Sequence, residues 1–151
     1  MAPSTPRSAA RRLLAAIWFA AFAVLATALF FLPLSMSPRV ALLYVVLPSI
    51  SAAISGSLWG AAILDSSRIN TYAASLLRGL GVSAGAYLIF AVFYACGLPL
   101  MEPLWSLRQA GNLFFFTLMF GLLLAGPMAV VAGLVAGATL FRFGRHILAK
   151  M

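Results

Sequence analysis

Four long stretches of the chain carry no charged residue and are almost continuously apolar. They cover residues 13–38, 40–64, 79–101 and 109–141. A helix needs about 20 apolar residues to cross the roughly 30 Å hydrocarbon core of a bilayer, so each stretch is long enough. The runs are rich in Ala and Leu and lack the alternation of membrane β-strands. The pattern predicts an all-α polytopic membrane protein, a bundle of four transmembrane helices at 13–34, 40–64, 79–100 and 113–141.

The composition leads to the same class of protein. Hydrophobic residues make up 64% of the 151 positions, only 8% are charged, and the mean hydropathy is +1.09. About a quarter of the residues of a soluble domain are charged. This chain cannot cover its surface with polar groups, so we expect lipid as its solvent, and its length fits a single domain.

The basic residues indicate an orientation in the membrane. The net charge is +8, and with a cytoplasmic N-terminus eight of the ten basic residues lie inside: Arg7, Arg11, Arg12, Arg68, Arg78, Arg142, Arg145 and Lys150. Only Arg39 and Arg108 then lie outside. Because positive charge favours the cytoplasmic side, we expect cytoplasmic basic tails at 1–12 and 142–151 and a location in a bacterial inner membrane.

The same arginines bear on possible partners. Arg11, Arg12, Arg68, Arg78, Arg142 and Arg145 flank apolar runs and do not cluster with aromatic residues on a polar face, so nucleic acid is not an expected partner. We interpret them as topology signals and contacts for lipid head groups.

The segments between the runs leave two questions open. Residues 32–38 and 98–103 are alike, and each precedes a helix with an internal proline and a Gly-x-x-x-Gly motif. The halves are either two tandem copies of one hairpin or a chance match among few residue types. Residues 65–78 are predicted to form a cytoplasmic amphipathic surface helix or an early start of the third span, with Asp65 as its cap.

Small residues mark the faces where helices can approach closely. Gly-x-x-x-Gly motifs occur at Gly56 and Gly60, at Gly81 and Gly85, and at Gly133 and Gly137, and Ser51 and Ser55 extend the first of these faces. Two glycines four residues apart lie on one side of a helix and let two backbones meet. The motifs predict close packing, either within one chain or between chains.

Two prolines fall inside predicted helices. Pro48 and Pro127 each lack a backbone N–H and clash with the preceding turn, so a kink is expected at each. The kinks are either ordinary features of membrane helices or hinges of a gated bundle.

Reactive side chains are scarce. The acidic residues are Asp65 and Glu102, the one histidine is His146, and the one cysteine is Cys96, all outside any recognisable catalytic or metal-binding spacing. We therefore expect no catalytic residue, no metal and no cofactor. Proton-coupled transport, which places ionisable groups inside the membrane, is also not favoured.

These observations lead to two hypotheses for function. The first is a non-enzymatic accessory, assembly or stabilising subunit of a membrane complex, which acts through helix contacts with the bilayer, another membrane protein or a second copy of itself. The second is a small oligomeric transporter or channel for a neutral solute or ion. Its path would be lined by the serines of the second span and by Asn112, Thr117 and Tyr87, around the kinks at Pro48 and Pro127.

Overall fold

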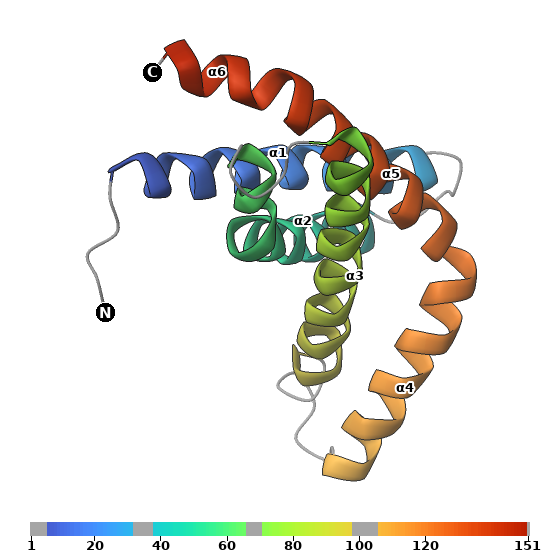
Figure 1. Ribbon diagram of the computed structural model, residues 1–151. Coiled ribbons are helices and arrows are strands. Elements are labelled where there is room, and N and C mark those ends of the chain that lie inside the picture. Colours follow the sequence, from blue (N-terminus) through green and yellow to red (C-terminus); the bar gives the residue numbers. More distant parts are fainter. Residues whose placement is uncertain (1–5, 32–37, 66–70, 98–105, 151) are drawn as a thin grey trace.

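The protein is built from helices. The computed structural model describes residues 6–31, 38–65, 71–97 and 106–150, and no strand occurs within these ranges. The elements are α1 (Pro6–Phe31), α2 (Pro38–Trp59), the 3-10 helix η1 (Gly60–Leu64), α3 (Tyr72–Gly97), α4 (Leu107–Leu124), α5 (Gly126–Thr139), the π-helix η2 (Leu140–Gly144) and α6 (Arg145–Lys150) (Figure 1).

Four helical stretches are long and apolar enough to cross a membrane. They are Ser8–Leu29, Tyr44–Leu64, Tyr72–Cys96 and Gly126–Leu148, while Arg108–Leu124 is a shorter apolar helix. The predicted helical class and the four candidate spans are thereby confirmed. The fourth span, however, lies further along the chain than its apolar run suggested.

The first three helices begin before their apolar runs do. α1 begins at Pro6, α2 at Pro38 and α3 at Tyr72, because Ala, Arg and Leu ahead of the runs are good helix formers. Part of the expected N-terminal tail is therefore helical. The linker at 65–78 was expected to form a surface helix or an early start of the third span. Residues 72–78 form the first part of α3, which is the second alternative. Residues 66–70, including Arg68, lie outside the described residues.

The start of α3 is capped by a side chain other than the expected one. The Thr71 hydroxyl accepts a hydrogen bond from the Ala74 N–H at 3.3 Å, three residues on. Such a bond satisfies a backbone donor that the first helical turn leaves unpaired. Asp65 instead ends η1, where its backbone N–H donates to the Ala62 carbonyl at 3.2 Å.

The chain from 107 to 150 differs from the single helix expected at 113–141. α4 ends at Leu124 and α5 begins at Gly126, because Pro127 cannot donate a backbone hydrogen bond and fits the first turn of a helix. α4 begins early because Ser106 and Gln109 form a reciprocal capping box. Beyond Thr139 the helix continues through η2 and α6, so the expected C-terminal tail is helical to Lys150.

The core lies where α1, α2, η1, α3, α5 and η2 meet. Its buried members are Ala15, Phe19, Ala52, Ile63, Leu64, Val82, Ala136 and Leu140. α1 packs mainly on α2, and α3 packs on α2 and α5. Among the described residues, α4 contributes nothing to this core, and Figure 1 shows it diverging from the bundle beside the far end of α3.

Candidate functional site

The small-residue face of α2 is occupied by α1. A Cβ atom on Gly56 would lie 2.9 Å from the Ala15 carbonyl oxygen and 3.1 Å from Cβ of Phe19. A Cβ atom on Gly60 would lie 2.9 Å from the Phe19 ring. Since real Cβ atoms do not approach so closely, both glycines are needed for α1 and α2 to pack as they do.

The glycines of α5 meet α3 through a glycine that the Gly-x-x-x-Gly search missed. A Cβ atom on Gly79 would clash with the carbonyl oxygen of Gly133 and lie 2.9 Å from Cα of Gly137. A Cβ atom on Gly137 would lie 2.6 Å from the Ser75 carbonyl oxygen. The missed signal has the same four-residue spacing but includes serine: Ser75, Gly79 and Ser83.

The two glycines of the α3 motif have different surroundings. A Cβ atom on Gly85 would clash with the Trp59 ring and lie 2.9 Å from the Ser55 hydroxyl oxygen, so this glycine lies against α2. A Cβ atom on Gly81 would meet nothing within 4 Å, and Gly81 is exposed. One motif therefore contains one packing position and one open position.

The two serines of α2 are fully buried and hydrogen-bonded. Ser55 donates across the helix interface to the Val82 carbonyl of α3 at 2.6 Å. Ser51 donates to the Leu47 carbonyl of its own helix at 2.9 Å. Neither lines the main cavity, so their hydroxyls bind protein acceptors inside the bundle.

The prolines differ in their effect. α2 continues through Pro48 without ending, and Pro48 lines the main cavity. Pro127 stands at the junction of α4 and α5, where Ala125 closes the first helix through hydrogen bonds to Gly121 and Leu122. Only the second proline therefore divides one predicted helix into two.

Two of the arginines expected at lipid head groups have partners inside the protein. The Arg11 guanidinium lies 3.4 Å from the Asp65 carboxylate. Arg145 donates to the Ile63 carbonyl at 3.2 Å and stacks over the Phe141 ring at 4.1 Å. These contacts join α1 and the C-terminal helices to η1.

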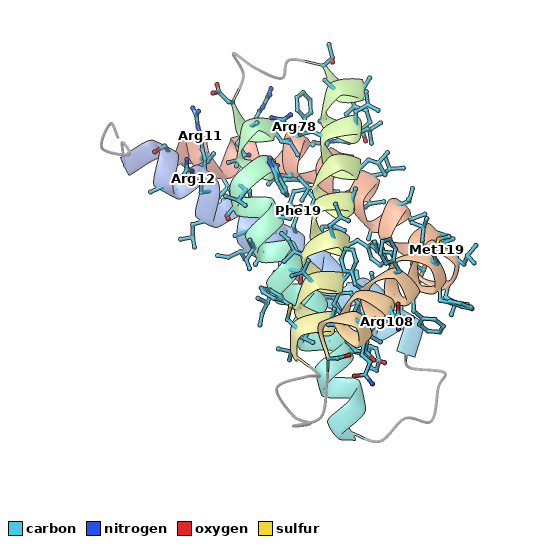
Figure 2. The ribbon with its side chains drawn as sticks, turned by 90° about the horizontal axis from the view of Figure 1, so that it is seen from below. Arg11, Arg12, Phe19, Arg78, Arg108 and Met119 are labelled. Carbon is cyan, nitrogen blue, oxygen red and sulfur yellow. The ribbon has the colours of Figure 1, made fainter. Side chains whose placement is uncertain are left out.

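The remaining described arginines of this set are exposed. They are Arg12, Arg78 and Arg142. Figure 2 shows Arg11, Arg12 and Arg78 toward one end of the protein and Arg108 toward the other. The labelled arginines thus lie at both ends of the protein, as expected if the apolar segments between them lie in a membrane.

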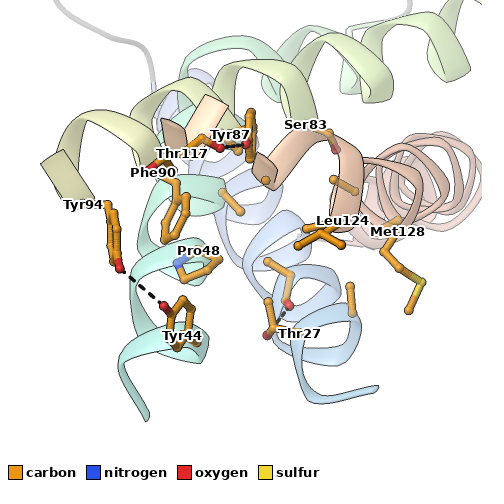
Figure 3. Close-up of a pocket in the computed structure, with 18 of the residues that line it drawn as sticks. Thr27, Tyr44, Pro48, Ser83, Tyr87, Phe90, Tyr94, Thr117, Leu124 and Met128 are labelled. Carbon is orange, nitrogen blue, oxygen red and sulfur yellow. Dashed lines mark hydrogen bonds between the residues drawn. The ribbon is translucent and has the colours of Figure 1, made fainter. Parts of the chain in front are cut away.

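An apolar cavity of about 650 Å³ lies between α4 and the other helices. α1, α2, α3, α4 and α5 all contribute to its wall (Figure 3). Its aromatic lining consists of Phe19, Phe22, Tyr44, Tyr87, Phe90, Tyr94, Phe116 and Phe120. α4 has its main contacts with α3 and α5, and the cavity is partly open to the surroundings of the protein.

Six residues of the lining carry a hydroxyl: Thr27, Tyr44, Ser83, Tyr87, Tyr94 and Thr117. Thr27 donates to the Ala23 carbonyl at 2.7 Å, and Tyr87 donates to the Thr117 carbonyl of α4. The hydroxyls of Tyr44 and Tyr94 lie 3.4 Å apart at one end of the cavity (Figure 3). The cavity therefore has a mainly apolar wall, and the two tyrosine hydroxyls form a polar end.

Tyr87 holds α4 at the position that leaves the cavity open. Its hydroxyl reaches the carbonyls of Thr117 and, at 3.2 Å, of Leu118, and it fills the space beside Gly121. Of the residues that the sequence placed along a transport path, Pro48, Tyr87 and Thr117 line this cavity, whereas the α2 serines and Asn112 do not. The enclosure of the cavity by α4 was not foreseen, because it depends on the break at Ala125.

The described residues contain no group of three or more His, Cys, Asp or Glu that could hold a metal ion. No family model matches the chain, and neither a curated protein nor a solved structure matches it. The geometry of the cavity and of α4 is therefore the basis for the functional argument.

Proposed function

We propose that the protein is a multi-pass integral membrane protein with cytoplasmic termini, located in a bacterial inner membrane. Large apolar side chains are exposed on every long helix, among them Leu13, Ile17, Leu77 and Leu123. Such a surface is stable in lipid and would aggregate in water. The separation of Arg11, Arg12 and Arg78 from Arg108 supports the orientation.

Within the membrane, the proposed role is a non-enzymatic accessory or stabilising subunit of a larger complex. The observation that carries this proposal is the outward face of α4. The helix packs on α3 and α5 along one side only, and its other side exposes Phe115, Met119 and Leu123 by 67, 67 and 75%. Gly56, Gly60, Gly133 and Gly137 are already used in contacts within the chain, and Gly81 is open. We assign the contact surface to α4 because of its large exposed side chains.

The composition of this face differs from that of the exposed side of α1. It carries an aromatic and a thioether side chain, Phe115 and Met119, beside Leu123. The exposed side of α1 is aliphatic instead, with Leu13, Ile17 and Leu25. α1 therefore provides a matched control surface on the same protein.

Crosslinking from the two faces tests the proposal. A single cysteine is placed at Leu123 or at Ile17 in a Cys96→Ser background, and each variant is treated in intact membranes with a photoreactive maleimide. We expect Leu123→Cys to give one adduct of defined mass, with another membrane protein or a second copy of the chain, and Ile17→Cys to give lipid adducts only. Native mass measurement after mild solubilisation should show the same complex. A monomer that labels alike from both positions would overturn the proposal.

A further inference from the structure

We propose that the apolar cavity binds an acyl chain of a membrane phospholipid, with the head group beside Tyr44 and Tyr94. This inference rests on the proposed membrane location and not on the proposed partner at α4. A cavity of about 650 Å³ is within the range of about 300–1,000 Å³ found for small-molecule sites. Its wall comes from five helices, so it is a built site and not a shallow patch on one helix.

The length of the cavity matches one leaflet of a bilayer. On α3 the lining runs from Val82 to Tyr94, a separation of twelve positions that corresponds to about 18 Å at 1.5 Å per residue. Half of a hydrocarbon core of about 30 Å is about 15 Å. The cavity therefore reaches from the membrane interface to the centre of the bilayer, the depth that an acyl chain of that leaflet occupies.

The polar end of the cavity lies at the interface. Tyr44 lies six residues after the start of α2 at Pro38, and Tyr94 lies three residues before the end of α3 at Gly97. Tyrosine rings prefer this depth because one end of the ring is apolar and the hydroxyl remains polar. The hydroxyl pair can therefore meet the ester and phosphate region of a lipid while Phe90 and Phe22 surround its chain.

Charge near this end favours a phosphate over a neutral head group. Arg108 is exposed at the start of α4, five residues before Leu113 in the cavity wall. This separation is about 7.5 Å along the helix, within reach of a long guanidinium side chain. Arg108 also lies at the end of the protein away from Arg11, Arg12 and Arg78 (Figure 2).

Water is a poor occupant of this cavity. Apolar cavities remain dry unless several polar groups converge on the same space. Thr27 and Tyr87 donate to backbone carbonyls, and the Tyr44 and Tyr94 hydroxyls bond each other. The hydroxyls of Ser83 and Thr117 are the remaining ones in a lining that is otherwise apolar. Because the cavity is partly open, a lipid in the surrounding bilayer can reach it, and an acyl chain that enters gains dispersion contacts with the aromatic wall.

Photolabelling in vesicles tests the proposal. The full chain is reconstituted in phosphatidylethanolamine and phosphatidylglycerol doped with a phosphatidylglycerol analogue that carries a diazirine in the middle of one acyl chain. In the wild type we expect adducts on cavity residues such as Phe90, Thr117 and Met128. Ala26→Phe, which fills the cavity from α1, should lower this labelling about tenfold, a loss of about 1.4 kcal/mol. Ala21→Phe, on the exposed side of α1, should leave it unchanged.

The composition of bound lipid provides a second measurement if a filled variant fails to fold. Wild-type protein purified in mild detergent should retain one phospholipid per chain in a native mass spectrum. A free fatty acid or an isoprenoid in its place would overturn the proposal, as would equal labelling of Ala26→Phe and Ala21→Phe. Such a result would leave crosslinking from Leu123 unaffected. The experiments therefore distinguish failure of the lipid-binding proposal from failure of the proposed contact surface on α4.

Discussion

Gly79 of α3 and Gly137 of α5 lie so close that a Cβ atom on Gly79 would be 2.9 Å from Cα of Gly137. The same Cβ atom would clash with the carbonyl oxygen of Gly133. Both neighbours are backbone atoms, which cannot rotate away as a side chain does. We therefore expect Gly79→Ala to separate the two helices and to lower the free energy of unfolding by about 1–3 kcal/mol, measured by denaturant titration in micelles.

The control for this variant lies two residues further along α3. Gly81 is exposed and has open space where its side chain would be, so Gly81→Ala should gain about 0.5–1 kcal/mol from helix propensity alone. If Gly79→Ala is as stable as Gly81→Ala, the crossing of α3 and α5 is not as close as described.

Gly56→Leu should disrupt the packing of α1 against α2. The new side chain would occupy the positions of the Ala15 carbonyl and the buried Phe19 ring. We expect a loss of several kcal/mol, comparable to deletion of a core side chain. Gly111→Leu on α4, which has nothing within 4 Å, is the matched variant and should elute and unfold like the wild type.

Ser55→Ala should cost more than Ser51→Ala. Ser55 joins α2 to α3 through its bond to the Val82 carbonyl, whereas Ser51 bonds only within α2. Interhelical hydrogen bonds of membrane proteins contribute about 0.6 kcal/mol on average and up to about 1.7. Equal thermal midpoints for the two alanine variants would contradict this interpretation of the serine face.

Arg145→Lys should be destabilising although the charge is kept. The guanidinium lies over the Phe141 ring, 4.1 Å from its centroid, and donates to the Ile63 carbonyl. An ammonium group lacks the several donors and the planar shape that allow both contacts at once. We expect a loss of about 1–2 kcal/mol. Arg142→Lys, at an exposed position over Phe143, should have no measurable effect on unfolding. Equal losses would mean that Arg145 acts only through its charge.

Much of the helix packing followed from residue size. Gly56 and Gly60 lie at a helix contact, and so do Gly133 and Gly137, because only glycine allows backbones to meet at these distances. Gly81 does not share this environment. The motif predicts on which face of a helix its two glycines lie. It does not predict which helix packs against that face, or how far along the face the contact extends, because both depend on tertiary packing.

The cavity and the course of α4 could not be predicted in this way. The uncharged run from 109 to 141 looks like one helix, and Pro127 indicated only that it would bend. That the helix ends at Leu124, and that Tyr87 then holds α4 through the Thr117 carbonyl, depends on contacts between residues distant in the chain. A hydropathy pattern does not predict contacts of this kind.

The π-helix at Leu140–Gly144 sets the angular position of everything that follows it. A π turn takes in one residue more than an α turn, and each added residue rotates the downstream helix by about 100°. With this surplus residue, Gly144 lies against Leu64 and Arg145 reaches the Ile63 carbonyl. The extra residue in the π turn therefore determines the direction in which the side chains of α6 point. Deleting one residue from the turn would leave the composition of α6 intact and point its arginine in another direction.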